Sequence, residues 1–428
     1  MCSILLGLVV GLPLSDRRDS SRIVKSTRAL LDFLFVAQYE SHTTATLERL
    51  QDYLAAFHDS KMVFVDLGVR KGFNLPKLHS LIHYASSIRL FGTTDNYNTE
   101  QTERLHIDLA KNAYRATNRK DEYPQMTAWL ERRERIERHT AFIDMKQKGP
   151  QQRTQPQRII GPPRARAQSV KMARHPSAKA AKFDDLKFRY GAHEFQDALA
   201  DFIAQANNPG VRGNALRRHA EDTLIPFRRV PVFHMIKFTE TGNAGNMAIV
   251  DSVYARPERK DKRGRIIPSR FDTVLVQNPS RDTQQGRVQG KSHSYWPSVN
   301  LRLTDRYSGL QIAQIRVVFH LPTKTVPEVC PSLDTSPATH LAYVEWFSPL
   351  ARTPDAPHHM YQVSRLMRDS ERCAGIIPVD WVLCSIHLLP RFGPVVPREW
   401  NSFTVLDQCH NFYVNPFANF QSYVAFVQ

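Results

Sequence analysis

The sequence predicts an α+β protein in three parts: a helical region at residues 1–145, a disordered basic linker at 146–182, and a β-rich domain at 183–428. Three observations predict this order. Apolar residues recur at helical spacing before residue 145, basic residues without apolar periodicity fill the linker, and short apolar runs between turns follow it. A chain of 428 residues with 42% hydrophobic content is long enough for two or three domains, each with its own core.

Amphipathic helices are expected throughout the first region. The clearest has Leu47, Leu50, Leu54 and Phe57 on one face. The same pattern predicts further helices at residues 25–39, 77–91, 99–117 and 125–143.

The chain starts with an apolar run, MCSILLGLVVGLPL. It lacks the positive start and the cleavage site of a signal peptide, and it is too short to span a bilayer. We therefore expect a buried helix here and no membrane association. A chain that opens directly on a core helix is also expected to be a fragment of a longer protein.

The linker concentrates the positive charge of the chain. Residues 146–182 contain ten Lys and Arg, no Asp or Glu and five Pro, and so carry +10 of the net charge of +17. A solvated linker would explain this composition, but the density of charge favours an arm that binds phosphates and releases their counterions. The residues expected to contact nucleic acid are Lys146, Lys148, Arg153, Arg158, Arg164, Arg166, Lys171, Arg174, Lys179 and Lys182.

One helix and then a series of strands are predicted after the linker. Phe195, Leu199, Phe202 and Ile203 mark the helix. Short apolar runs predict strands at residues 231–238, 271–278, 309–322, 340–347, 360–365 and 411–415. Several short strands separated by turns suggest a small barrel or sandwich.

The five cysteines form no repeated Cys-x-x-Cys pair, which suits a reducing intracellular compartment. Cys384 and His387 form a Cys-x-x-His, and Cys409 and His410 follow. Zinc uses such ligands, but a tetrahedral site usually has two tight pairs. Buried, unligated cysteines are therefore the favoured interpretation.

Two glutamates and a histidine lie three residues apart at Glu100, Glu103 and His106. With Asn98 or Thr99 as the N-cap, both glutamates would lie in the first turn of a helix. Acids there are stabilised by the helix dipole by about 0.5 kcal/mol each. Carboxylates are also ligands for Mg²⁺, and enzymes that cut nucleic acid use two such ions. The residues alone leave both interpretations open.

The segments FGTTDNYNTE, TERLHIDLAK and AYRATNRKDEYPQM, preceded by NLPKLHSLIHY, resemble the Plavaka family of fungal transposases in the CACTA-like group. The likeness extends upstream through ALLDFLFVAQYESHTTATLERLQDYLAAFH and, beyond the linker, through RFDTVLVQ, GLQIAQIRVVFHLP, LAYVEWFSPL and FYVNPF. It implies the tail of a ribonuclease-H-like core with a helical insertion, followed by the C-terminal β domain of that family. By this resemblance Glu100 is the candidate third acid of a DDE site and Glu103 the second choice. The matching segments also contain His79, His83, Asp95 and His106.

The resemblance implies what the protein does. A DDE site also needs two aspartates on early strands, and this chain is expected to begin after them. The expected function is therefore that of a transposon-derived, DNA-binding protein that is catalytically inactive, with Mg²⁺ as a cofactor only in a complete site and none otherwise. One alternative is an active nuclease that receives its aspartates from another chain. The expected location is the nucleus, with the cytoplasm as the alternative, and no small-molecule substrate is expected.

A binding or scaffold module is the remaining alternative. Its β-rich domain would contact a protein or chromatin partner through a groove lined by Tyr343, Trp346, Phe347 and Tyr361. Aromatic residues in such strands more often fill a core. Their burial distinguishes the two interpretations.

Overall fold

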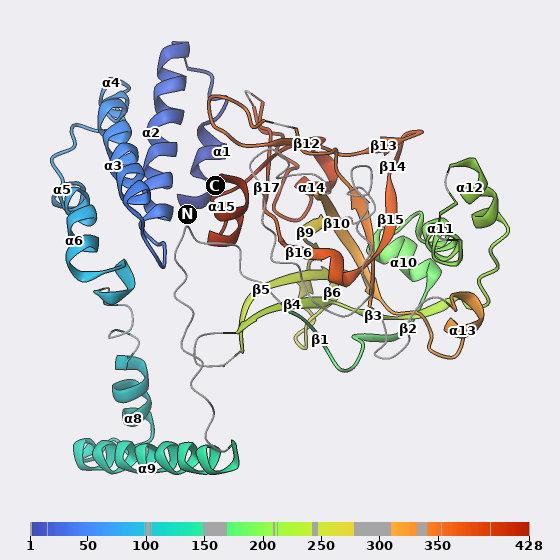
Figure 1. Ribbon diagram of the computed structural model, residues 1–428, viewed down its shortest axis with the longest axis horizontal. Coiled ribbons are helices and arrows are strands. Elements are labelled where there is room, and N and C mark those ends of the chain that lie inside the picture. Colours follow the sequence, from blue (N-terminus) through green and yellow to red (C-terminus); the bar gives the residue numbers. More distant parts are fainter. Residues whose placement is uncertain are drawn as a thin grey trace. The chain divides into compact units, whose positions relative to one another are not determined.

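A computed structural model gives the architecture of the chain (Figure 1). It describes all residues except 1, 15, 98, 100–102, 104, 149–168, 209, 212, 242–246, 278–309, 332–339, 352, 394 and 428. Two compact units divide the chain. One comprises residues 1–31, 56–71 and 164–428, and the other residues 32–55 and 72–163.

The second unit is helical. Its elements include parts of α2 (Arg17–Val36) and α3 (Thr44–Ser60), then α5 (Pro76–Ser80), α6 (Tyr84–Phe91), a π-helical turn (His106–Lys111), α8 (Asn112–Arg115) and α9 (Glu122–Lys148). Phe33 packs edge-on against Tyr84 with ring centroids 5.5 Å apart, and Thr94 Oγ1 donates to the Ala37 carbonyl at 3.0 Å. These contacts join α2 to α6 and to the turn that follows α6.

The first unit is built on a seven-stranded antiparallel sheet. Its core path runs β15-β11-β10-β3-β2, with β9 paired to β10 and β16 paired to β9. The strands are β2 (Ala178–Lys182), β3 (Arg229–Phe233), β9 (Thr273–Gln277), β10 (Leu310–Phe319), β11 (Leu341–Trp346), β15 (Ala374–Pro378) and β16 (Val382–Ser385). All of β10 beyond Leu310 is buried, which is typical of a central strand covered on both faces.

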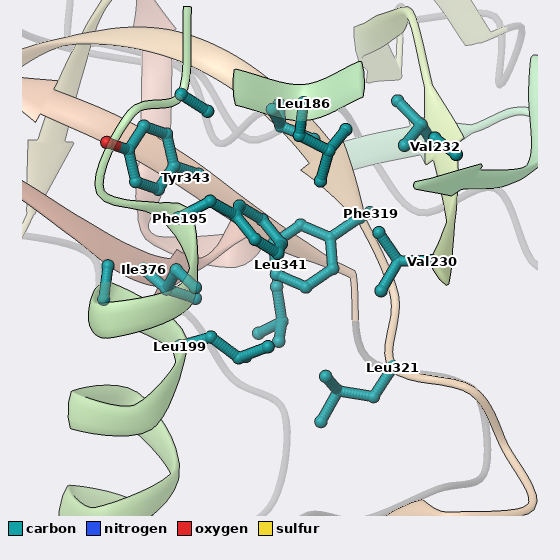
Figure 2. Close-up of a cluster of buried hydrophobic side chains, with 14 of the residues drawn as sticks. Leu186, Phe195, Leu199, Val230, Val232, Phe319, Leu321, Leu341, Tyr343 and Ile376 are labelled. Atoms are coloured by element: carbon teal, nitrogen blue, oxygen red, sulfur yellow. The ribbon is translucent and has the colours of Figure 1, made fainter. Parts of the chain in front are cut away.

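Helices cover one face of this sheet. They are α10 (Phe183–Tyr190), α11 (Phe195–Asn207) and α13 (Val326–Val329), and α12 (Asn214–Glu221) packs against α11. Figure 2 shows Phe195 of α11 against Phe319 of β10 and Tyr343 of β11, at ring-centroid distances of 5.1 and 5.8 Å. Leu186 and Leu199, both fully buried, complete the contact between α10, α11 and the sheet.

A four-stranded sheet covers the other face. Its order is β1 (Ser169–Met172), β4 (Met235–Thr241), β5 (Met247–Arg256) and β8 (Arg270–Phe271). Ile236, Phe238, Val253 and Ala255 point inward and pack with residues of the seven-stranded sheet in one hydrophobic cluster. Because side chains alternate along a strand, the residues between them lie on the outer face.

Smaller elements complete the unit. They are α1 (Leu5–Val9), α4 (Val63–Asp66), β6 (Arg259–Lys260), β7 (Ile266–Ile267), β12 (Gln362–Ser364), β13 (Met367–Arg368), β14 (Glu371–Arg372), β17 (Leu388–Pro390), α14 (Val405–Gln408), β18 (Asn411–Val414) and α15 (Phe420–Val427). Leu6 of α1 is fully buried, and the Asn415 amide donates to the Ser3 carbonyl at 2.9 Å. The expected helix at the N-terminus is therefore present and packs on the β-rich region, but it is buried only at Leu6 and Gly7, whereas Leu5 and Leu8 are 42% and 47% exposed.

A cluster of charged side chains is buried beside the seven-stranded sheet. Glu345 is 2% exposed and accepts hydrogen bonds from Arg316 at 3.1 Å, Arg365 at 3.4 Å and Arg372 at 2.9 Å. Asp407 of α14 pairs with Arg316, and it accepts from Arg372 at 2.6 Å. The Arg372 guanidinium also donates to the Asp407 carbonyl at 2.9 Å, so the cluster holds α14 against the sheet.

The predicted α+β class is confirmed, with a helical N-terminal region and a β-rich C-terminal region. All six predicted strand segments contain strands, and the helix predicted around Phe195 is α11. Among the described strands, no pairing closes either sheet into a barrel. None of the described helices is both long and apolar enough to cross a membrane.

The predicted disorder of the whole segment 146–182 is wrong at both of its ends. Helix α9 extends to Lys148, and β1 and β2 begin at Ser169 and Ala178. In β1, Val170 and Met172 pack on the core while Lys171 faces outward. Both strands lie at the edges of their sheets, where exposed lysines are common. Their basic composition was therefore mistaken for that of a disordered segment. The unit boundaries also differ from the predicted ones, because residues 1–31 group with the β-rich region.

Candidate nucleic-acid interface

Basic side chains are paired across the outer face of the four-stranded sheet. Lys171 of β1 lies directly opposite Lys237 of β4, which in turn lies opposite Ser252 of β5. Arg256 of β5 lies opposite Arg270 of β8. Directly opposed residues point to the same side of a sheet, so each pair presents two cations together. We call these four cations the basic sheet face.

Opposed like charges destabilise an antiparallel pair, by up to about 1 kcal/mol relative to a neutral one. Asp272 pairs with Arg270, with 2.8 Å between Nε and Oδ1. Among the side chains that the structure describes, no carboxylate lies within ion-pair distance of Lys171, Lys237 or Arg256. The basic sheet face therefore keeps most of its charge uncompensated by the protein.

An aromatic ring lies between the two arginines. Tyr254 is two residues before Arg256 on β5 and so shares its face. The guanidinium carbon of Arg270 lies 4.2 Å from the centre of the Tyr254 ring, and that of Arg256 lies 5.7 Å from it. The hydrogen bond to Asp272 raises the pKa of Arg270. Both guanidinium groups therefore lie within cation–π distance of one ring, and Asp272 fixes the orientation of Arg270.

A basic hairpin extends the ladder of β5 and β8. Arg256 pairs with Arg270, Arg259 with Ile267 and Lys260 with Ile266, so the register continues unchanged from the sheet into the hairpin. We call residues 259–267 the basic hairpin. Its exposed cations are Arg259, Lys260, Lys262, Arg263 and Arg265.

The turn of the basic hairpin is closed by hydrogen bonds. Asp261 Oδ1 accepts from the backbone N–H of Arg263 at 2.8 Å and of Arg265 at 2.9 Å, and its Oδ2 accepts from Arg265 Nε at 2.8 Å. The bond from the Arg265 backbone is the main reason why the pKa of Asp261 is lowered. Gly264 has φ +78°, the left-handed conformation that a three-residue hairpin loop requires at its last position. Residues 262–264 therefore project from a fixed base.

Burial also affects a histidine next to this region. His234, between β3 and β4, bonds the Tyr190 hydroxyl at 2.9 Å. Its pKa is lowered by burial and by the nearby charges of Arg259, Arg189 and Arg256. His234 therefore links the strand pair β3–β4 to Tyr190, the last residue of α10.

The structure describes only part of the predicted basic arm. Lys171 belongs to the basic sheet face, and Arg174, Lys179 and Lys182 are exposed on or next to β1 and β2. The Lys146 ammonium lies 5.0 Å from the Phe142 ring centre on α9, which ends at Lys148. Arg153, Arg158, Arg164 and Arg166 lie outside the described residues.

The predicted acidic site is only partly described. Glu100, the candidate third acid, lies outside the described residues, and Glu103 is exposed and accepts from the Thr99 hydroxyl at 3.3 Å. Asp95 lies in a short 3₁₀ turn, and His106 begins the π-helical turn in place of the α-helix predicted there. Their roles stay predictions.

His79 and His83 are exposed and pack edge-on against each other with ring centroids 5.2 Å apart. This is the contact expected of residues four apart on one helix face. In the part of the chain that the structure describes, no group of three or more His, Cys, Asp or Glu side chains is arranged to hold a metal ion.

The cysteines near the second predicted ligand set are core residues. Burial raises the pKa of the Cys384 thiol to about 12, and burial also raises that of Cys409. Both belong to one hydrophobic cluster with Phe412 and Phe347. Among the described residues His387 bonds the Asn415 amide, with 3.1 Å between Nδ1 and Nδ2. The favoured interpretation, packing rather than zinc binding, agrees with these contacts.

The alternative of an aromatic groove is wrong, and the favoured interpretation, that these aromatic residues fill a core, is confirmed. Tyr343, Phe347 and Tyr361 are at most 4% exposed and belong to hydrophobic clusters. Trp346 is partly buried and packs against the cluster between the two sheets. Both faces of β11 are covered, and Tyr343, Phe347 and Tyr361 are packed within cores, so these three side chains line no open groove.

The basic hairpin was missed in the sequence, although a signal for it exists. Residues 256–270, RPERKDKRGRIIPSR, contain seven Lys and Arg against two acids. Asp261 and Gly264, three residues apart, are typical turn residues. Strands β6 and β7 are two residues each, which is too short for apolar alternation to reveal them.

Comparison with known proteins identifies one family. The family model described as a domain of unknown function, DUF6830, matches residues 140–364. No curated protein and no solved structure matches the chain. The matched segment contains the whole basic sheet face and the basic hairpin.

Proposed function

The chain belongs to the DUF6830 family, and from this premise we propose that it is a transposon-derived DNA-binding protein whose family domain binds the phosphate backbone. The observation that carries the proposal is the pairing of cations across the four-stranded sheet. Lys171 opposes Lys237, and Arg256 opposes Arg270. A surface with two such pairs is stabilised when a polyanion lies on it, because each phosphate offsets the repulsion between two cations.

The chemistry of the side chains supports phosphate contacts rather than base recognition. Arg256 and Arg270 can each donate two parallel hydrogen bonds to a phosphate, and the lysines act as point charges. Phosphate contacts position a protein on nucleic acid and carry no sequence information. The basic sheet face is therefore proposed to bind DNA without regard to its sequence, with a strong dependence on salt.

The transposon origin rests on the resemblance to Plavaka transposases, and the nuclear location follows from it. The proposal includes no strand transfer. Mg²⁺ would be needed only by a complete DDE site. Glu103, the second choice for the third acid of such a site, accepts a hydrogen bond from Thr99. A single carboxylate does not hold Mg²⁺ against water, because this ion dehydrates reluctantly.

The test is a salt titration of DNA binding. Affinity for a 20-base-pair duplex is measured by fluorescence anisotropy between 50 and 200 mM KCl for the full chain and for Lys171→Gln/Lys237→Gln. Each lost phosphate contact is expected to reduce the slope of log K against log salt by about one and to lower the affinity roughly eightfold at ~0.1 M salt.

A matched control removes the same charge elsewhere. Lys324 and Arg398 are exposed and lie outside the four-stranded sheet and the basic hairpin, so Lys324→Gln/Arg398→Gln should leave the slope close to that of the parent. Equal losses in the two double variants would show that overall charge, and not the basic sheet face, governs binding. A third variant, with Gln in place of Arg153, Arg158, Arg164 and Arg166, measures how much the predicted basic arm contributes to the affinity for DNA.

A further inference from the structure

We propose that the basic hairpin enters the major groove of double-stranded DNA while the basic sheet face contacts the phosphates beside it. This inference rests on the proposed function and names the form of nucleic acid that the site takes. It depends on the shape of the hairpin, on its exposed side chains and on the position of Tyr254.

The hairpin has the dimensions of a groove-binding ribbon. The ladder that begins at Arg256 and Arg270 keeps its register to Lys260 and Ile266. From Arg256 to Asp261 a strand of this length spans about 17 Å. The major groove of B-form DNA is roughly 8.5 Å deep and admits a two-stranded β-ribbon. The distal half of the ribbon can therefore fill the groove while Arg256 and Arg270 remain at the level of the phosphates.

The fixed turn lowers the entropy that binding would cost. Asp261 accepts three hydrogen bonds from Arg263 and Arg265, at 2.8 to 2.9 Å. The Gly264 backbone N–H donates to the Asp261 carbonyl at 3.0 Å. A loop that is already ordered loses less freedom when it meets its ligand. Lys262 and Arg263 are thus presented at the tip of a stiff element.

The side chains of the hairpin match the chemistry of the major groove. Lys and Arg donate to the O6 and N7 acceptors of guanine, which lie in this groove. Ile266 is 62% exposed, opposite Lys260 and next to Arg265, and only the major groove offers it an apolar partner, the thymine methyl group. The minor groove presents neither of these features.

Single-stranded nucleic acid fits the site less well. Proteins that bind single strands stack bases on exposed aromatic side chains. Tyr254 is the aromatic residue next to the arginines of the basic sheet face, and the Arg270 guanidinium lies 4.2 Å from its ring centre. A base would have to displace that guanidinium, which Asp272 holds at 2.8 Å. Duplex RNA fits less well too, because its deep and narrow major groove does not admit a ribbon.

The test combines affinity with groove-specific protection. The full chain is titrated with a 20-base-pair DNA duplex, a single strand of 20 nucleotides and a 20-base-pair RNA duplex. Dimethyl sulfate then reports protection of guanine N7, in the major groove, and of adenine N3, in the minor groove. We expect the DNA duplex to bind roughly tenfold tighter than either alternative, with N7 protected and N3 not.

Variants separate the hairpin from the sheet. Lys262→Ser/Arg263→Ser changes only exposed residues at the tip and should abolish N7 protection and lower duplex affinity roughly tenfold. The control Lys324→Gln/Arg398→Gln should keep N7 protection. Protection of N3 instead of N7, equal affinity for the single strand, or N7 protection that survives the tip substitution would overturn the inference.

Failure of the proposed function has a different signature. If the proposed function is wrong, either no nucleic acid binds, or the Lys171→Gln/Lys237→Gln variant leaves the salt dependence of binding unchanged. If that variant weakens duplex binding but the tip variant does not, the proposed function stands and the groove assignment falls.

Discussion

Replacing Glu345 by Gln should destabilise the β-rich unit more than any other single change of charge in the cluster around it. Glu345 is 2% exposed and is the acceptor that Arg316, Arg365 and Arg372 share. Without its charge, three guanidinium groups face Asp407 alone. Asp407 lies 2.6 Å from Arg372 but 3.8 Å from Arg365, so Arg365 loses its closest carboxylate.

The magnitude follows from the burial of Arg365. Its side chain is 3% exposed, and burial lowers the pKa of Arg365, which reflects the free energy needed to keep a charge there. Removing one partner of a buried ion pair costs about 3–5 kcal/mol. Gln keeps one acceptor oxygen, so we expect about 3 kcal/mol for Glu345→Gln and about 5 kcal/mol for Glu345→Leu.

Urea denaturation followed by circular dichroism measures this effect. With a slope near 3 kcal/mol per molar urea, a loss of ~3 kcal/mol moves the midpoint by about 1 M. The control is Glu328→Gln on α13, an exposed glutamate whose substitution should change stability by less than about 0.5 kcal/mol. A double variant, Glu345→Leu/Arg365→Leu, should recover part of the loss, because it removes the buried charge of Arg365 together with that of its closest carboxylate, while Arg316 keeps Asp407 as its partner. If Glu345→Gln shifts the midpoint no more than Glu328→Gln, the cluster does not stabilise the fold as argued.

Two further predictions concern protonation and reactivity. Burial alone would raise the pKa of Asp407, but Arg316 and Arg372 outweigh it and lower that pKa below its ordinary 3.8. The charged Asp407 therefore stabilises the fold fully above the pKa of the unfolded state, and this stabilisation is lost as the pH falls through the pKa of the folded state. The difference in unfolding free energy between the parent and Asp407→Asn should be constant from about pH 5 to 7 and shrink below about pH 4. Urea titrations at each pH measure this difference. A constant difference down to about pH 2 would contradict this. Cys373 is half-buried, whereas Cys330, Cys384 and Cys409 are buried, with the pKa of Cys384 raised to about 12 by burial. In a Cys2→Ser variant, maleimide at neutral pH should label one thiol of the native protein, and none after the further substitution Cys373→Ser. Mass spectrometry counts the labelled thiols. Two or more labelled thiols would mean that the buried cysteines are accessible.

The sequence predicted those elements whose signal is local. Six strand segments and α11 have runs of apolar residues long enough to show a period. The pairs β6–β7 and β13–β14 have two residues on each strand, so no period exists to be read. They form because the longer strands around them bring their ends together. The edge strands β1 and β2 were missed for a related reason, since half of their side chains face away from the core and carry the charge of the segment.

The candidate interface could not be predicted from composition, because the strand register decides which basic residues lie opposite each other. Lys171 and Lys237 are far apart in the sequence, and each could serve solubility on an edge or a surface strand. Placed opposite each other, and followed on the same face by Arg256 opposite Arg270, they oppose the pairing of the strands that carry them. Solubility needs positive charge but not this arrangement, since two lysines that are not directly opposite each other would supply the same charge. A bound polyanion offsets the repulsion at both pairs at once, so the pairing, more than the net charge of +17, is the argument for a nucleic-acid ligand.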